Sequence, residues 1–405
     1  LVRNREPEVT TENEIAHFAM AAPSVAVHSV GAGGGSVAWI DRAGRFCVGP
    51  QSAGAEPGPS CYGKGGTEPT VTDADLILGY LNPDYFLGGR MKVDPELAKQ
   101  GIKEKIASKL GMSLEEAAFG IYKIVNTNMA EGVGVPSVFK GYDPRACLMV
   151  CAGGAGPVHM CDIAAELGMP LILVPKASSV YCASGMLISD IKHDFARVTH
   201  MVLLPGYVDF DLINTNFQEM LKEANDALER EGVTPEKRQF IYSADLRYEA
   251  QFNEITVPIP LTNGRFIEDN LAELKESFNT NHEILYAYNL PEATQELMTL
   301  RLSALGITDK PVFAELPFMG EDASGAIKGR KEIYYEGKRL EALIYDGTKM
   351  GNGNKVSGPA IIEEPATTLL LTPDWQTVCD SYSNYLVFRQ GVSLEESFSK
   401  VGVKK

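Results

Sequence analysis

Residues 147–174 read CLMVCAGGAGPVHMCDIAAELGMPLILV, and this stretch decides the fold. Cys147–Val150 is an apolar run typical of a buried strand, and Leu171–Val174 is a second such run. Between them lie a glycine loop, Ala152–Pro157, and a helical segment, Val158–Leu167. Strand, loop, helix and strand in this order predict a βαβ unit with parallel strands, and therefore an α/β fold.

The glycine loop stands at the start of a helix, so Gly153, Gly154, Ala155 and Gly156 are candidate ligand contacts. Free backbone N–H groups and the positive end of the helix dipole attract an anion or a nucleotide at such a place. The loop does not match GxGxxG and no Walker lysine follows it, so the sequence supports neither a Rossmann site nor a P-loop. The alternative is a turn that only lets the helix pack closely on the sheet.

Glycine is also concentrated upstream, where residues 31–66 hold 11 of the 39 glycines. Strand-like pieces at Val37–Ile40 and Phe46–Val48 interrupt the glycines, so this segment is not a low-complexity linker. Tight β-turns are one explanation of the composition. The other is a loop that lines a polar ligand, with Gly33 and Gly34 among its contacts.

Capping residues predict where several helices begin. Asp94 followed by a proline predicts a helix that runs to Leu110, and Ser113 opens a capping box for a helix through about Met129. Asp73 follows two threonines at a further helix start, where a carboxylate ordinarily caps the helix. The alternative for Asp73 is Mg²⁺ binding through water.

The pattern changes near residue 200. Amphipathic helices are predicted over 211–231 and 266–286, a strand hairpin over 240–259, a strand over 297–307 and β-rich structure over 330–390. These patterns place a domain boundary between 198 and 199, with an α/β part at 1–198 and a mixed, β-rich part at 199–405.

The composition of the chain bears on its binding partners and on the cell compartment in which it works. The formal net charge is −16, which argues against nucleic acid or an anionic membrane surface as the main partner. No apolar run approaches the roughly 18 residues that a membrane span needs. Seven cysteines without zinc spacing indicate reduced thiols in a cytoplasmic protein.

The side chains with catalytic potential are few. His159 falls in the first turn of the helix after the glycine loop, where a neutral core histidine is the expectation and a catalytic histidine is the alternative. His193 and Asp194 are adjacent on a predicted strand and so point to opposite faces. Cys61 follows a rigid proline-glycine turn and is expected to be structural, with a reactive thiol as the alternative. No catalytic residue follows from the sequence.

Several strings together resemble the hydantoinase/oxoprolinase family, in its hydantoinase A-type, ATP-binding subunit. They occur in family order and span almost the whole chain. The long string at Val48–Gly66 is the most specific. The strings are PEVTTE (7–12), VGAGGGSVAWID (30–41), VGPQSAGAEPGPSCYGKGG (48–66), TVTDADLILGYL (70–81), FLGG (86–89), YDPR (142–145), GGAGPVH (153–159), RYEAQFNEITV (247–257) and SGPAIIEEPATT (357–368).

This resemblance implies an actin-like ATPase half-fold, as in sugar kinases and heat-shock chaperones, over 1–198. It implies a reaction in which ATP, with Mg²⁺ or Mn²⁺, phosphorylates a carbonyl oxygen so that a cyclic amide opens. The related alternative is an acetone- or acetophenone-type carboxylase that activates a ketone. By the resemblance, Gly153, Gly154, Ala155 and Gly156 contact the nucleoside side of ATP. Gly33, Gly34 and Asp73 remain the further candidate cofactor contacts. A hydantoinase B-type subunit is the implied partner in a hetero-oligomer.

One departure from the family pattern concerns the phosphates. The resemblance implies two GGT-type phosphate loops, one of them just before PEVTTE, and this sequence contains neither. Since the chain opens at Leu1 rather than at methionine, the expectation is the C-terminal portion of a longer subunit, inactive by itself. A non-catalytic assembly subunit is the remaining alternative.

Overall fold

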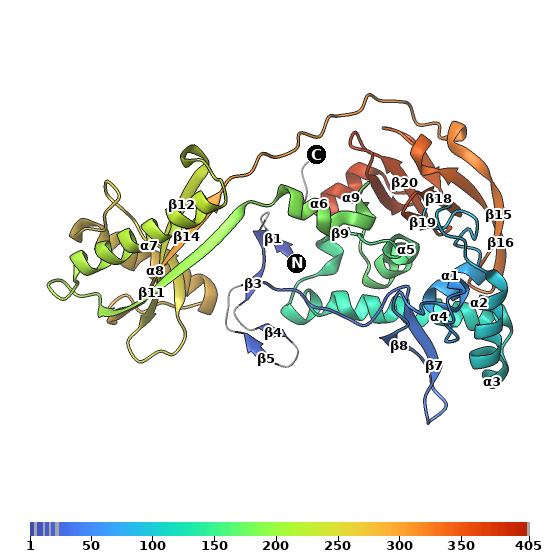
Figure 1. Cartoon of the computed structure of the whole chain (residues 1–405), viewed down its shortest axis with the longest axis horizontal. Helices are drawn as coiled ribbons and strands as arrows, with labels where there is room; N and C mark the ends of the chain where they lie inside the picture. The colour runs from blue at the N-terminus through green and yellow to red at the C-terminus, as the bar shows by residue number, and fades with distance from the viewer. Residues whose placement is uncertain (4–5, 11–12, 16–17, 21–23, 403–405) are drawn as a thin grey trace. The chain divides into compact units, whose positions relative to one another are not determined.

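The computed structural model describes residues 1–3, 6–10, 13–15, 18–20 and 24–402. Contacts divide the chain into two compact units, which are unit 1, Leu1–Ser184 with Phe313–Lys405, and unit 2, Gly185–Val312 (Figure 1). This division differs from the boundary expected at residues 198 and 199. The physical reason is that the last 90 or so residues complete the sheets and the core of unit 1.

The predicted βαβ unit is confirmed in unit 1. Strand β9 (Leu148–Val150) and strand β10 (Leu171–Val174) are parallel, and helix α5 (Gly156–Leu167) connects them. The expectation that the first strand is buried is wrong, because β9 lies at the edge of its sheet and Val150 is 47% exposed. The sheet has the order β17-β20-β21-β10-β9, with β17 (Lys355–Ser357), β20 (Trp375–Cys379) and β21 (Tyr385–Arg389) from the C-terminal part.

The predicted helix starts are also confirmed. Helix α1 (Val71–Ile77) begins at Thr70, which forms a capping box with Asp73. Helix α4 (Leu114–Gly134) begins at the Ser113 capping box and is one turn longer than expected. The helix expected from Asp94 to Leu110 consists of α2 (Pro95–Ile102), a π-helical turn (Lys103–Ala107) and α3 (Ser108–Leu110).

A second sheet of unit 1 packs on these helices. It has the order β15-β16-β18-β19, formed by β15 (Ile327–Tyr335), β16 (Lys338–Asp346), β18 (Ala360–Glu364) and β19 (Thr367–Leu371). Ile333, Ile361 and Leu370 of this sheet share one buried cluster with Val71 and Ile121 of the helices. Burial of this shared apolar surface holds the two separate stretches of unit 1 together.

Unit 1 also contains a hairpin and several short elements. The hairpin pairs β7 (Ser36–Ile40) with β8 (Phe46–Ser52). The short elements are β1 (Val2–Arg3), β2 (Glu6–Pro7), β3 (Val9–Thr10), β4 (Asn13–Ile15), β5 (Phe18–Met20), β6 (Ser24–Val25), α9 (Leu394–Lys400) and 3₁₀ turns at 60–62, 138–140, 144–146, 178–180, 324–326 and 347–349. The division between unit 1 and unit 2, at residues 184 and 185, falls within helix α6 (Tyr181–Ile188).

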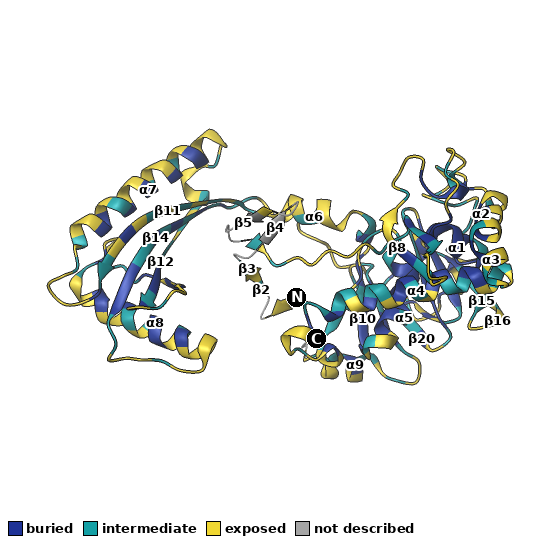
Figure 2. Cartoon of the chain, turned by 90° about the horizontal axis from the view of Figure 1, so that it is seen from below, coloured by how far each residue is buried: buried dark blue, intermediate teal, exposed yellow. Residues whose placement is uncertain are grey.

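Unit 2 is an antiparallel sheet with two helices. The sheet has the order β11-β14-β12-β13, formed by β11 (Ile191–Val202), β14 (Gln295–Gly306), β12 (Arg238–Tyr248) and β13 (Ile255–Pro258). Helices α7 (Phe210–Arg230) and α8 (Leu271–Tyr286) pack on the same face, since their apolar residues and those of the sheet form one buried cluster. Figure 2 shows the exposed sides of both helices turned away from the sheet. The expected helices, hairpin and strand are thus confirmed.

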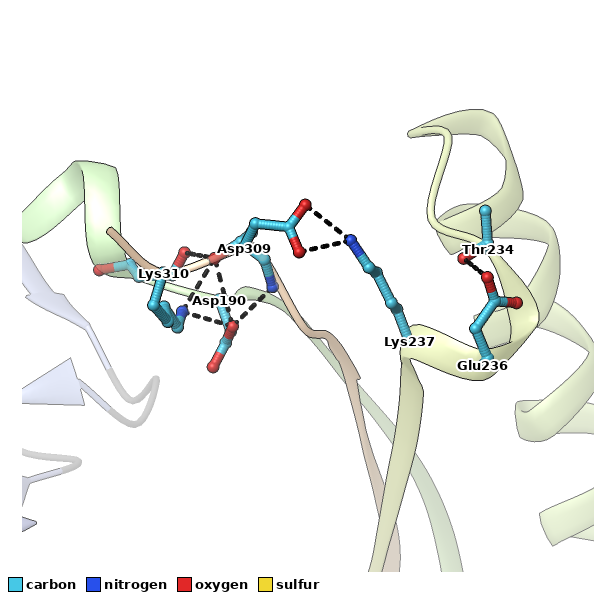
Figure 3. A network of polar contacts seen from close by, with 8 residues as sticks. Asp190, Thr234, Glu236, Lys237, Asp309 and Lys310 are labelled. Atoms are coloured by element: carbon cyan, nitrogen blue, oxygen red, sulfur yellow. Dashed lines mark hydrogen bonds and ion pairs between the residues drawn. The ribbon is translucent and has the colours of Figure 1, made fainter. Parts of the chain in front are cut away.

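A polar network ties the two ends of unit 2 together (Figure 3). The Lys310 ammonium donates to Asp190 Oδ1 at 2.6 Å and to the Ile188 carbonyl at 2.5 Å. Next to it, Lys237 donates to both carboxylate oxygens of Asp309 at 2.8 Å. The chain therefore enters and leaves unit 2 side by side. In the described parts of the chain, no helix is long and apolar enough to cross a membrane.

Candidate functional site

Six of the family-like strings meet at one cavity of unit 1, which we call the glycine-loop cavity. Its volume is about 230 Å³. Figure 1 shows that its parent elements α1, α5, β18 and β19 lie in the same unit. The lining includes Gly34, Gly35, Tyr62, Thr72, Asp75, Leu81, Asn82, Tyr85, Phe86, Leu87, Gly154, Ala155, Val158, Glu363, Glu364, Ala366, Thr367 and Thr368.

The glycine loop contributes Gly154 and Ala155 to the cavity wall. Ala155 is the N-cap residue of α5, and no side chain caps this helix start. Pro157 has no N–H and the N–H of Val158 donates to the Ala155 carbonyl at 3.1 Å, so the group that the first turn offers to a ligand is the N–H of Gly156. Gly153 has a φ of +96°, and its N–H donates to the Ser178 carbonyl at 2.7 Å. Gly153 and Gly156 shape the loop without being among the lining residues.

Gly33 and Gly34 were the upstream glycines predicted to contact a ligand, and of these two only Gly34 lines the cavity. Its carbonyl accepts hydrogen bonds from both the backbone N–H and the Oγ1 of Thr72, each at 2.9 Å. These bonds fix the glycine-rich segment to the start of α1. The N–H of Gly33 instead donates to Ser36 Oγ at 3.0 Å, within its own turn.

Asp73 is buried and its carboxylate is saturated by donors. It accepts hydrogen bonds from the N–H groups of Ser60, Cys61 and Thr70, at 2.7–3.2 Å, and from the Thr70 hydroxyl at 2.9 Å. Asp73 is not among the lining residues. Its geometry is that of a helix cap that also anchors the turn before it.

Asp75 lies in helix α1, two residues after Asp73, and it lines the cavity. It is not among the site residues predicted from the sequence. The residue is 1% exposed, and its Oδ1 has no hydrogen-bond partner. Burial, followed by the nearby charge of Asp73, raises the pKa of this carboxyl well above its usual value. The one signal in the sequence is a second acidic residue in this short helix, two positions after the capping Asp73.

Two more buried carboxylates come from the end of β18. Glu363 pairs with the Lys328 ammonium and accepts from Asn82 Nδ2 at 2.9 Å. Glu364 pairs with Lys176 at 2.5 Å and accepts from the Tyr385 hydroxyl. Each glutamate therefore has a lysine that compensates its charge. A glutamate pair in a buried strand was the sequence signal for this site.

Neither His159 nor His193 is placed as a catalytic group. His159 is fully buried, and burial lowers its pKa from the usual 6.5 to about 4, so it is neutral near pH 7 as expected. His193 contacts Glu231 and Asp194 contacts Lys192 and Ser303, so they form no dyad.

All seven cysteines are free thiols. Cys61 is buried, and burial together with the charge of Asp73 raises the pKa of its thiol, which opposes the reactive-thiol alternative.

The cavity chemistry is acidic and rich in uncharged polar groups. Its lining carries three carboxyl groups and no lysine or arginine among the described residues. Such a wall suits a nucleoside or a small carbonyl compound and does not suit a polyphosphate by itself. The volume falls below the roughly 300–1,000 Å³ typical of ligand pockets, which also favours a part of a nucleotide or a small molecule.

No group of three or more His, Cys, Asp or Glu side chains is placed to hold a metal ion in the described part of the chain. Thr11 and Glu12 of the PEVTTE string lie outside the described residues.

The chain is similar to proteins that are named as subunits of enzymes. It is 36% identical over 377 residues to caprolactamase subunit alpha of Pseudomonas jessenii, covering 92% of this chain and 54% of that relative. It is 37% identical over 366 residues to the acetophenone carboxylase gamma subunit of Aromatoleum aromaticum, covering 87% and 49%. The chain therefore spans about half the length of the relatives it matches.

Solved structures show the same relationship. A nucleotide-free structure of acetone carboxylase superposes with a TM-score of 0.86 at 26% identity, covering 95% of this chain and 56% of that one. The ATP-dependent caprolactamase of Pseudomonas jessenii superposes with a TM-score of 0.74 at 34% identity, covering 94% and 55%. The expected fold class, an α/β fold related to the actin-like ATPases with a mixed, β-rich second part, is confirmed.

Two family models match consecutive parts of the sequence. Residues 1–195 match the model described as Hydantoinase/oxoprolinase, and residues 209–388 match the Hydantoinase/oxoprolinase C-terminal domain. The chain belongs to the hydantoinase/oxoprolinase family.

Proposed function

We propose that this chain is part of a subunit of an ATP-dependent carbonyl-activating enzyme that opens a cyclic amide by hydrolysis. The observation that carries the proposal is the meeting of the glycine loop, Gly34 and a buried unpaired carboxyl group at one cavity. The names caprolactamase subunit alpha and 5-oxoprolinase 1 of two relatives support a cyclic amide as the substrate.

The chemical logic concerns the poor reactivity of an amide. Phosphoryl transfer from ATP to the amide oxygen turns that oxygen into part of a phosphate leaving group, so water can attack the carbon. In the overall balance, a cyclic amide, ATP and two waters give an amino acid, ADP and phosphate. Each phosphorylated cyclic amide adds water, the C–N bond opens, and a second water releases the phosphate.

The described residues take two roles in this scheme. The backbone of Gly154 and Ala155, at the start of α5, is placed to contact the nucleoside side of the nucleotide. Gly34, held by Thr72, lets the backbone of the facing loop approach the bound molecule closely. Gly153, Gly156, Gly33 and Asp73 support this geometry from outside the lining.

Three further parts of the proposal concern a metal ion, the phosphate loops and a partner subunit. Because the lining lacks a cation for the phosphates, we propose that Mg²⁺ or Mn²⁺ arrives with the nucleotide. Since the sequence contains neither GGT-type phosphate loop, these residues alone are expected not to hydrolyse ATP. A hydantoinase B-type subunit is the proposed partner, a view supported by relatives that are named as alpha, beta and gamma subunits.

A ketone carboxylase is the second candidate. It is supported by the TM-score of 0.86 with acetone carboxylase and by the 37% identity to an acetophenone carboxylase subunit. Both candidates share the activation of a carbonyl oxygen and differ in the acceptor.

The test uses the longer natural subunit with its co-purified partner and measures ADP release from ATP. Release that depends on 2-pyrrolidinone or caprolactam is the expected result. Release that depends on acetone or acetophenone together with bicarbonate would favour the carboxylase instead. No release with any of these substrates would contradict both and favour a non-catalytic assembly subunit.

A further inference from the structure

Asp75 and His159 form a buried pair behind the glycine-loop cavity. Asp75 Oδ2 lies 3.6 Å from His159 Nε2, and both side chains are buried, with 2% and 0% of their surface exposed. Asp75 Oδ1 and His159 Nε2 are two of only four buried side-chain N or O atoms without a hydrogen-bond partner among the described residues. Of these four, only Asp75 Oδ1 belongs to a residue of the cavity wall.

A chain of polar groups continues behind this pair. His159 Nδ1 lies 2.7 Å from Asn126 Oδ1, which can only accept, so the proton of the neutral imidazole is on Nδ1. Asn126 Nδ2 in turn donates to Asp162 at 3.4 Å, and the Tyr335 hydroxyl donates to Asp162 at 2.8 Å. The lone pair of His159 is then on Nε2, which lies 3.6 Å from Asp75 Oδ2.

The protonation of the pair follows from its surroundings. Burial keeps His159 neutral and favours the protonated form of Asp75. We place the proton of Asp75 on Oδ2, the oxygen that faces His159 Nε2 at 3.6 Å, a separation longer than a hydrogen bond. Oδ1 is the carbonyl oxygen of that carboxyl group and retains its capacity to accept.

We propose that Asp75 Oδ1 accepts a hydrogen bond from an uncharged N–H or O–H donor of the molecule bound in the glycine-loop cavity, with His159 as the positioning residue behind it. The inference rests on the proposed function for the identity of that molecule. The two candidate donors are a ribose hydroxyl of the nucleotide and the N–H of a cyclic amide.

The other carboxyl groups near the cavity do not offer the same acceptor. Glu363 and Glu364 each face a lysine, and Asp73 is saturated by four donors. A phosphate group is not the partner of Asp75, because the described lining holds no lysine or arginine that would bind the phosphate charge. An uncharged donor of the bound molecule gives this buried acceptor the partner that it lacks.

The test needs no turnover and uses the chain with adenosine and 2-pyrrolidinone as probes. Infrared difference spectra of the wild-type chain minus Asp75→Asn isolate the C=O band of the protonated Asp75 carboxyl. We expect one of the probes to shift this band to lower frequency. The band should also move in ligand-free His159→Gln, a signature that a merely space-filling histidine would not produce. Ser178→Ala, which removes another buried unpartnered oxygen outside the lining, is the matched control and should leave the band unchanged.

Dissociation constants measured by calorimetry give the second readout. Asp75→Ala should weaken binding of the effective probe roughly ten-fold, as expected for one lost hydrogen bond, whereas Asp75→Asn retains an acceptor oxygen and should stay within about three-fold. Loss of the band shift with 2′,3′-dideoxyadenosine identifies the ribose, and loss with N-methyl-2-pyrrolidinone identifies the amide N–H.

The inference is overturned if neither probe binds, or if a probe binds without shifting the band and Asp75→Ala binds it as well as the wild type does. Failure of the proposed function shows differently, as absent ADP release by the longer subunit while the band shift persists.

Discussion

The carbonyl of Gly34 accepts two hydrogen bonds from Thr72, one from its backbone N–H and one from its Oγ1, both at 2.9 Å. The glycine-rich segment and helix α1 are therefore joined at the wall of the glycine-loop cavity. A Cβ atom at Gly34 would lie 2.9 Å from Thr72 Oγ1 and 3.4 Å from the Cβ of Ala155. This site has no room for a side chain.

Gly34→Ala is accordingly expected to destabilise unit 1 by about 1–3 kcal/mol, the usual cost of overpacking, and to weaken binding in the cavity. Gly33→Ala is the matched control, because nothing lies within 4 Å of its added Cβ and its φ is not positive. It should stay within about 0.5 kcal/mol of the wild type. Urea unfolding followed by tryptophan fluorescence reports on unit 1, since both tryptophans, Trp39 and Trp375, belong to it. Equal effects of the two substitutions would contradict the assignment.

His159 predicts a dependence of stability on pH. The unfolded chain binds the proton below its ordinary pKa of 6.5, whereas the folded chain binds it only near pH 4. The stabilising contribution is therefore complete above pH 6.5 and is lost as the pH falls to 4, by about 3 kcal/mol. The raised pKa of Asp75 acts in the opposite direction, so the measurement belongs in an Asp75→Asn background.

In that background, the urea midpoint of unit 1 should fall between pH 7 and pH 4.5, and it should fall less when His159 is also replaced by glutamine. The prediction fails if both proteins show the same pH profile.

Asp73 is expected to matter for stability more than an ordinary helix cap does. Asp73→Ala leaves three buried backbone N–H groups without their acceptor, which should cost about 3–5 kcal/mol. Asp94→Ala removes an N-cap that accepts from the N–H of Glu96, and it should cost about 1 kcal/mol. Urea unfolding compares the two, and a loss at Asp73 no larger than that at Asp94 would show that the cap geometry is not decisive.

The cysteines should differ sharply in reactivity. Cys182 is exposed, whereas Cys61 is buried with a thiol pKa raised by burial and by Asp73. Iodoacetamide at pH 8 should therefore modify Cys182 in the native chain and reach Cys61 only after unfolding, as peptide mass spectrometry can measure. In Cys182→Ser the native chain should still protect Cys61. Early labelling of Cys61 would instead support a reactive thiol at that position.

Local sequence patterns predicted many of the helices and strands of this protein. The βαβ unit, the capping boxes and the helices and strands of unit 2 could be predicted because apolar periodicity and capping chemistry act over a few residues. Glycine strings identified the family, and they also contain Gly34, Gly154 and Ala155 of the cavity wall. The buried first strand was the local expectation that failed, since periodicity does not tell an edge strand from a central one.

What only the tertiary structure decided is which of these strings meet and which side chains they leave unpaired. The return of β15 to β21 to unit 1 depends on apolar surfaces more than 200 residues apart, which no local pattern reports. Asp73 and Asp75 are alike in the sequence, yet the fold saturates one with donors and leaves the other with a free oxygen at a cavity. Hydrogen bonding and burial are properties of the packed chain, and they alone separate a structural carboxylate from a candidate functional one.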